Sequence, residues 1–212
     1  MTDEGNQGLL TDVAAYYSGK LAEHGLSPRG VDWNGEESQV LRFRQLCKII
    51  DRSGEVSIND LGCGYGALFD LLVADRQNVR YLGVDVSASM IDAARERLKG
   101  QANARFIQAS APDTIGDYGV ASGIFNVRLN RTDAEWQAYL ESTLDQLDRT
   151  SRFGFAFNCL TSYSDADRMR PDLYYADPCR LFDLCKRRYA KNVALLHDYG
   201  LYEFTILVRK QV

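Results

Sequence analysis

The chain has 212 residues, of which 45% are apolar, and this suits one compact domain with an ordinary hydrophobic core. Its formal net charge of −4 leaves no overall basic field, so nucleic acid is not expected as a partner. Five cysteines without a CxxC pair and only two histidines predict no metal site and favour reduced thiols in a cytoplasmic protein, and no apolar run approaches the length of a membrane span.

The first 52 residues carry two helical patterns. One helix is predicted over residues 9–23, followed by a break rich in glycine and proline. A second helix begins at a capping pattern, Asn34-x-x-Glu37, and should turn these apolar side chains inward: Val40, Leu41, Leu46 and Ile50. We expect residues 1–52 to cover a cofactor cleft, with Trp33 either over the cofactor or in the core.

Residues 55–66, EVSINDLGCGYG, are the most informative segment. Apolar alternation predicts a strand, and the glycines that follow allow the backbone to turn into a helix and to approach a ligand closely. A nucleotide-like cofactor can bind at such a turn. The pattern Gly62-x-Gly64-x-x-Ala67 also satisfies the dinucleotide fingerprint, so a nicotinamide cofactor stays open at this point.

Two carboxylates flank the predicted cofactor turn. Asp60 would repel a pyrophosphate, whereas it would attract the ammonium and sulfonium groups of S-adenosylmethionine. Asp85 ends a second predicted strand, at a position where a carboxylate can accept hydrogen bonds from both ribose hydroxyls. Asp85 suits both cofactors, so Asp60 is the residue that favours S-adenosylmethionine.

The motifs NDLGCGYG and GVDVS, with the helical stretch SASMIDAARERL behind them, resemble the class I S-adenosylmethionine-dependent methyltransferases. The resemblance implies that the glycine turn holds the methionine part and Asp85 the ribose. It also places Ser110 where the family usually has an acid that meets the adenine amino group, and the backbone N–H of Ala111 beside the adenine ring. The implied cofactor-binding residues are Asp60, Gly62, Cys63, Gly64, Asp85, Val86, Ser110 and Ala111.

Strand and helix patterns alternate from residue 55 onward, which predicts a parallel sheet with helices on both faces. Further strands are expected at 104–110, 117–126 and 152–158, and helices are expected to begin at the caps Thr132 and Asp177. Residues 193–208 contain two strand patterns separated by a turn at Gly200, too short for a parallel crossover, so they predict a hairpin.

The predicted fold class is therefore α/β. We expect a Rossmann-like, seven-stranded, mostly parallel sheet with an antiparallel C-terminal hairpin strand, helices on both faces and an N-terminal helical cover. Residues 1–212 are predicted to form a single methyltransferase domain, in which 53–212 make the cofactor-binding core.

Methyl transfer from a sulfonium uses an activated donor, so no fixed catalytic motif is expected, and none is visible. Three side chains at or near predicted strand ends are candidate catalytic residues: Asn126, Tyr163 and His197. Asn126 can instead structure its loop. His197 and Asp198 would point to opposite faces of a strand, which argues against a catalytic pair.

Five residues are candidates for binding the acceptor: Tyr16, Tyr17, Arg128, Tyr174 and Tyr175. The last two belong to residues 161–177, a polar connection without a sustained period, which we expect to form a wall of the acceptor pocket because unstructured connections of this length are usually functional. Ordinary packing of the tyrosines and a surface ion pair of the arginine remain alternatives.

The leading hypothesis is a methyltransferase that uses S-adenosylmethionine and moves a methyl group to an oxygen or nitrogen of a small-molecule acceptor, such as a metabolite, natural product or sugar. The alternatives are a nicotinamide-dependent oxidoreductase and a non-catalytic S-adenosylmethionine-binding protein. The chain lacks the Asn/Asp-Pro-Pro-aromatic signature of methyltransferases acting on nucleic-acid amino groups. The acceptor and the oligomeric state stay open.

Overall fold

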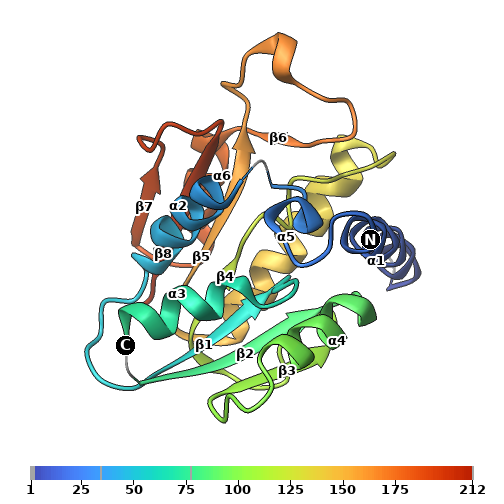
Figure 1. Cartoon of the computed structure of the whole chain (residues 1–212). Helices are drawn as coiled ribbons and strands as arrows, with labels where there is room; N and C mark the ends of the chain where they lie inside the picture. The colour runs from blue at the N-terminus through green and yellow to red at the C-terminus, as the bar shows by residue number, and fades with distance from the viewer. Residues whose placement is uncertain (1–2, 34, 77, 212) are drawn as a thin grey trace.

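The computed structural model describes residues 3–33, 35–76 and 78–211, with side chains from residue 7 onward within these ranges (Figure 1). The helices are α1 (Asp3–His24), α2 (Glu36–Cys47), α3 (Ala67–Asp75), α4 (Ala88–Arg97), α5 (Asp133–Arg149) and α6 (Pro178–Arg188), with short 3₁₀ turns η1 (Pro28–Val31) and η2 (Ala166–Arg168). The strands are β1 (Val56–Leu61), β2 (Val79–Asp85), β3 (Ala104–Gln108), β4 (Gly116–Ala121), β5 (Ser151–Thr161), β6 (Tyr175–Ala176), β7 (Asn192–Leu196) and β8 (Glu203–Arg209).

The strands form one sheet in the order β3-β2-β1-β4-β5-β8-β7, and the two-residue β6 pairs with the end of β5. Strands β1 to β5 are parallel, whereas β8 is antiparallel to both β5 and β7. This order confirms the predicted mostly parallel sheet and the C-terminal hairpin. It also brings the carboxyl ends of β1, β2, β3 and β4 to one edge, where open α/β sheets bind ligands.

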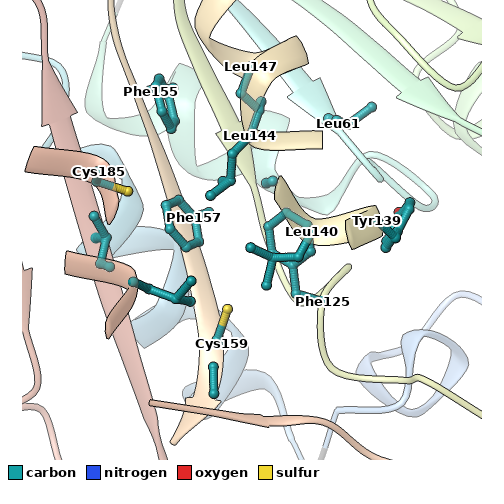
Figure 2. Packing of buried hydrophobic residues seen from close by; sticks show 14 of the residues in the cluster. Leu61, Phe125, Tyr139, Leu140, Leu144, Leu147, Phe155, Phe157, Cys159 and Cys185 are labelled. Atoms are coloured by element: carbon teal, nitrogen blue, oxygen red, sulfur yellow. The ribbon is translucent and has the colours of Figure 1, made fainter. Parts of the chain in front are cut away.

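Two hydrophobic clusters cover the two faces of the sheet. One contains buried side chains of α1, α5 and α6, and the other contains those of α2, α3 and α4. Figure 2 shows Leu140, Leu144 and Leu147 of α5 packed toward Phe155 and Phe157 of β5. Full burial of such a leucine stabilises the fold by roughly 1.5–3 kcal/mol.

Two predicted helix caps are confirmed. Thr132 and Glu135 form both hydrogen bonds of a capping box at the start of α5, and the Asp177 carboxylate accepts two backbone N–H groups at the start of α6. Asn34, the predicted cap of α2, lies outside the described residues, and the residue that precedes α2 is Gly35. Val40 and Leu41 are only half-buried, because polar Arg42 and its neighbours occupy part of the inward face.

Some strand boundaries differ from the prediction. β4 ends at Ala121, because Gly123 takes a positive φ of 76° and a turn closes from Asn126 N–H to the Gly123 carbonyl. Residues 161–177, orange in Figure 1, are not structureless: they contain η2 and β6, and Leu173 forms a β-bridge with Val127. Backbone pairing with the loop after β4 fixes the second half of this segment.

Candidate active site

A cavity of about 500 Å³ lies at the carboxyl ends of β1, β2, β3 and β4. It collects most of the residues that the sequence predicted for the cofactor: Asp60, Gly62, Cys63, Gly64, Asp85, Val86 and Ser110. Ala111 is not among its lining residues. The site thus brings together residues from three strand ends that are well separated in the sequence.

The glycine turn after β1 is shaped by close contacts on both sides. Gly62 has φ of 77°, and a Cβ atom at this position would lie 2.1 Å from Cγ2 of Ile124. Its N–H donates to the Val84 carbonyl at 2.7 Å, which ties the turn to the end of β2. Any side chain at residue 62 would therefore strain the backbone and displace the wall formed by Ile124.

Asp85 is held by two backbone donors. Its Oδ2 accepts from Gly64 N–H and its Oδ1 accepts from Ser87 N–H, both at 2.9 Å. Burial raises the pKa of Asp85, while these hydrogen bonds oppose the rise. Each carboxylate oxygen has a second lone pair, so the group is oriented and can still accept hydrogen bonds from a ligand's hydroxyls.

Asp60 is 2% exposed and lies below the glycine turn. Tyr81 donates its hydroxyl to Asp60 Oδ2 at 2.5 Å, and the tyrosine ring packs between Phe69 and Phe106. Burial raises the pKa of Asp60 to about 7, the Tyr81 hydrogen bond opposes the rise, and the charge of Asp85 adds to it. Near neutral pH this carboxyl is poised between its two charge states, so a cation beside it would favour ionisation.

Asp60 and Asp85 are the charged side chains among the described residues that line the cavity; no lysine, arginine or histidine of that part of the chain lines it. A cation would be attracted into such a cavity. A pyrophosphate would enter without a positive partner, which disfavours the nicotinamide alternative.

The cover over the cavity comes from the N-terminal part of the chain. Helix α1 contributes one face, with lining residues at a helical spacing: Gln7, Leu10, Val13 and Tyr17. After η1, Val31 and Trp33 continue the wall. Trp33 packs against the turn after β4, since a Cβ atom on Gly123 would lie 2.4 Å from the indole Cζ2.

A buried polar network supports Trp33. The guanidinium of Arg42 lies 4.0 Å from the centre of the Trp33 ring and forms an ion pair with Glu203, with Nη2 to Oε1 at 2.7 Å. Asn158 donates to Glu203 and accepts from Gly123 N–H, both at 2.7 Å. The chain of contacts joins α2, β5 and β8 to the cavity wall, and no local sequence pattern indicated it.

A second polar cluster fastens the cover to the segment that follows β5. The Asp32 carboxylate accepts the Tyr16 hydroxyl at 2.8 Å and lies 3.2 Å from Lys20 Nζ and 3.8 Å from Arg170 Nη1. We name these four residues the Asp32 clasp. Asp32 itself has φ of 60°, a left-handed conformation that aspartate tolerates better than most residues.

The candidate catalytic residues do not reach the cavity. Asn126 is buried, and its Oδ1 accepts from Leu160 N–H at 3.0 Å. This hydrogen bond matches the alternative role in which Asn126 structures its loop. Tyr163 is 68% exposed, and its ring lies 5.9 Å from that of His197, outside the lining.

Of the five candidate acceptor residues, Tyr17 lines the cavity. The guanidinium of Arg128 donates to backbone carbonyls of residues 171, 173 and 131 and to the Asp133 carboxylate. Arg128 therefore stabilises the loop after β4. Tyr16 belongs to the Asp32 clasp, and the hydroxyl of Tyr175 accepts from Arg170 N–H. Tyr174 is half-buried and donates its N–H to the Asn126 carbonyl.

Sequence reasoning missed lining residues from two helices: Gln39 and Phe43 of α2, and Tyr139, Ser142, Thr143 and Gln146 of α5. Helical periodicity marks which residues share a face, but it does not say that the face borders a cavity. Within the described ranges no group of three or more His, Cys, Asp or Glu residues is arranged to hold a metal ion. No helix in the same ranges is long and apolar enough to cross a membrane.

Known proteins resemble this chain in sequence. Residues 58–150 match the family described as "Methyltransferase domain". A protein of Mycobacterium tuberculosis (strain ATCC 25618 / H37Rv) named "Putative methyltransferase Rv1506c" is 65% identical over 163 residues, covering 77% of this chain and 98% of that protein. A trans-aconitate 2-methyltransferase of Rhodopseudomonas palustris (strain BisB18) is 36% identical over 106 residues, covering 44% of this chain and 40% of that protein.

Two solved structures share the fold. The structure described as "DhpI-SAH complex structure" has a TM-score of 0.64 at 17% identity and covers 96% of this chain and 97% of its own. Human N-acetylserotonin methyltransferase in complex with SAM has a TM-score of 0.59 at 16% identity and covers 100% of this chain and 68% of its own. At these identities the likeness is one of fold.

Proposed function

The chain belongs to the class I S-adenosylmethionine-dependent methyltransferases, and from that premise we propose where the cofactor binds and what accepts the methyl group. The cofactor lies across the carboxyl ends of β1, β2 and β3. The acceptor is a small molecule that receives the methyl group on an oxygen or nitrogen atom. The observation that carries the placement is a cavity with two buried or partly buried carboxylates and no cationic side chain among its described lining residues.

The residues present fit S-adenosylmethionine. Asp85, already oriented by Gly64 and Ser87, would accept the ribose hydroxyls. Asp60 would supply the negative charge that the ammonium and sulfonium groups require. When bound, the cofactor supplies a methyl group activated by positive sulfur, so positioning accounts for much of the rate.

The rest of the cavity excludes water and orients the partners. Trp33, held by Gly123 and the Arg42 guanidinium, closes one wall, and Tyr17 and Phe43 add flat apolar surface. A dry site strengthens the attraction between the carboxylates and a cation. We place the acceptor between this cover and the turn after β4, where Ile124 lines the cavity.

The charge of the cavity also bears on the acceptor. A carboxylate or phosphonate acceptor would lose water and find no positive side chain among the described lining residues, so the sulfonium of the bound cofactor alone would offset that cost. An uncharged hydroxyl or amine enters more easily. This supports a neutral small-molecule acceptor, even though five partial relatives are named for trans-aconitate.

The strongest basic run does not favour a nucleic-acid acceptor. At the end of α6, Arg187 pairs with Asp183 and Arg188 with Asp145, while Lys186 donates to a backbone carbonyl. Cations at a helix C-terminus are favourable in themselves. The run is therefore explained by local pairing.

Calorimetric titration with S-adenosylhomocysteine and with NADH tests the placement. We expect S-adenosylhomocysteine to bind at micromolar affinity or better, about −8 kcal/mol, and NADH not to bind measurably. Transfer of label from methyl-labelled S-adenosylmethionine to a panel of neutral alcohols, phenols and amines and to matched carboxylates would then test the acceptor. Preferential labelling of carboxylates would contradict the neutral-acceptor proposal.

A further inference from the structure

The connection between β3 and β4, residues 109–115, contains no helix. Parallel strands are usually joined by a crossover of a dozen or more residues that contains one. Asn59 of β1 holds this connection by donating Nδ2 to the Thr114 carbonyl at 2.8 Å.

Helix α5 presents two different faces. Leucines at 140, 144 and 147 pack in the core, and Figure 2 shows Tyr139 on the side of the helix away from Phe155 and Phe157. On that second side the lining residues follow a helical spacing: Tyr139, Ser142, Thr143 and Gln146. They border the same cavity as Ala109 and Ser110, which follow β3.

Gln146 is a side chain on this face whose amide donor and acceptor are both available to a ligand. Thr143 donates its hydroxyl to the Tyr139 carbonyl at 2.9 Å, so its donor is already used. Ser142 is exposed. The half-buried side-chain amide of Gln146 makes no hydrogen bond to any other residue that the structure describes, although its backbone carbonyl accepts from Thr150.

We propose that Gln146 recognises the amino edge of the cofactor's adenine, in place of the acid that is absent at Ser110. The proposal rests on the proposed placement of S-adenosylmethionine. A glutamine amide offers a donor and an acceptor side by side, and adenine presents an amino donor next to a ring-nitrogen acceptor. Because no crossover helix lies between β3 and β4, a residue from the second half of α5 lines the same cavity as Ser110.

The recognition is specific in a testable way. The deamino analogue of S-adenosylhomocysteine, in which hydrogen replaces the amino group, keeps the ring-nitrogen acceptor but loses the donor that the amide carbonyl would accept. The unmodified protein should therefore bind S-adenosylhomocysteine more tightly than the deamino analogue. A residue that merely shaped the cavity would affect both ligands alike.

Calorimetry with both ligands on matched variants tests this. Gln146→Ala should weaken S-adenosylhomocysteine about 5- to 10-fold more than it weakens the deamino analogue, because only S-adenosylhomocysteine loses the amino-group hydrogen bond. Gln146→Glu keeps an acceptor and should retain the preference for adenine. Gln137→Ala is the control, because the Gln137 side chain bonds to Glu141 on α5 and does not line the cavity.

An unchanged ratio of the two affinities in Gln146→Ala, with the fold intact by circular dichroism, would overturn the proposal. Equal weakening of both ligands would also overturn it, since that is the signature of a structural role. Failure of the unmodified protein to bind S-adenosylhomocysteine would instead overturn the cofactor placement and the inference with it.

Discussion

At the floor of the cavity, Gly64 and Asp85 meet through one 2.9 Å hydrogen bond between neighbouring strand ends, whereas in the cover Asp32 meets Arg170 from a distant part of the chain. The floor is built from backbone turns and carboxylates on adjacent parallel strands. The cover is fastened by side-chain pairs between separate segments. The first region should therefore govern how tightly the cofactor binds, and the second how fast it enters and leaves.

The largest effect should come from the floor. Asp85→Ala removes the charged acceptor for the ribose, and we expect S-adenosylhomocysteine affinity to fall by about 2 kcal/mol or more, roughly 30-fold. Asp85→Asn keeps one acceptor for Gly64 N–H, so it shows whether the loss of affinity in Asp85→Ala comes from a general loss of structure. Asp92→Ala on α4, with a side chain that is 76% exposed, is the matched control. Unchanged calorimetric affinity in the folded Asp85 variants would show that the ribose is held elsewhere.

The second prediction tests whether Asp60 acts through its negative charge or by shaping the glycine turn. Asp60→Asn preserves an acceptor for the Tyr81 hydroxyl but removes the negative charge. We expect it to weaken S-adenosylmethionine about tenfold at pH 8 and to leave adenosine almost unaffected, because only the former carries positive charge beside this residue. Equal losses for both ligands would mean that the carboxylate only shapes the glycine turn.

The raised pKa of Asp60 predicts that cofactor affinity and protein stability both depend on pH. With its pKa raised to about 7, Asp60 is protonated below that pH in the ligand-free protein, so the affinity for a cationic ligand should fall below pH 7 and level off at about the tenfold loss expected for Asp60→Asn. Between pH 4 and pH 7 the folded protein holds a proton that the unfolded chain has released, so stability falls as pH rises through this window. Asp60→Asn should flatten the binding profile and raise the melting temperature at pH 8. A binding profile that keeps its slope in the variant would assign the proton to another group.

A smaller effect, on rate rather than affinity, should come from the cover. Asp32→Asn tolerates the left-handed backbone but weakens the Asp32 clasp, so we expect S-adenosylhomocysteine to dissociate about 3- to 10-fold faster. The readout is fluorescence, since the chain has two tryptophans, and Trp33 lines the cavity while Trp136 is fully buried. Asp167→Asn, an exposed residue of the 161–177 segment outside the clasp, should leave the rate unchanged. Equal dissociation rates in the two variants would show that the Asp32 clasp does not control how fast the ligand leaves.

The smallest effect is expected at Ser110. Ser110 lines the cavity but is exposed to solvent. Ser110→Ala should therefore cost about 1 kcal/mol or less of the free energy of S-adenosylhomocysteine binding. A loss of more than tenfold in calorimetry would mean that the serine hydroxyl, and not Gln146, is the main contact with adenine.

The contrast between floor and cover also explains what the sequence could predict. Asp60, the glycines and Asp85 lie at ends of strands whose alternation is visible locally, and the sheet topology then brings them together. The capping box at Thr132 and the hairpin at the C-terminus were likewise predictable, because each depends on residues close in the chain.

The remaining contacts depend on pairs that only the folded chain brings together. From the sequence alone Arg42 would be expected on the exposed side of a helix, because its partner Glu203 lies in β8, far along the chain. Arg128 was a candidate for binding the acceptor, and only the return of residues 171–173 past the loop after β4 shows where its donors go. Gln146 gave no signal, since its exposure to the cavity follows from the missing helix between β3 and β4.

A crystal structure of the protein with S-adenosylhomocysteine tests the central claim most directly. The account predicts the ligand across the carboxyl ends of β1, β2 and β3, with both ribose hydroxyls within hydrogen-bond distance of the Asp85 carboxylate and the amino-acid end at the glycine turn above Asp60. Ligand density outside this cavity, or a ribose that does not contact Asp85, would contradict it.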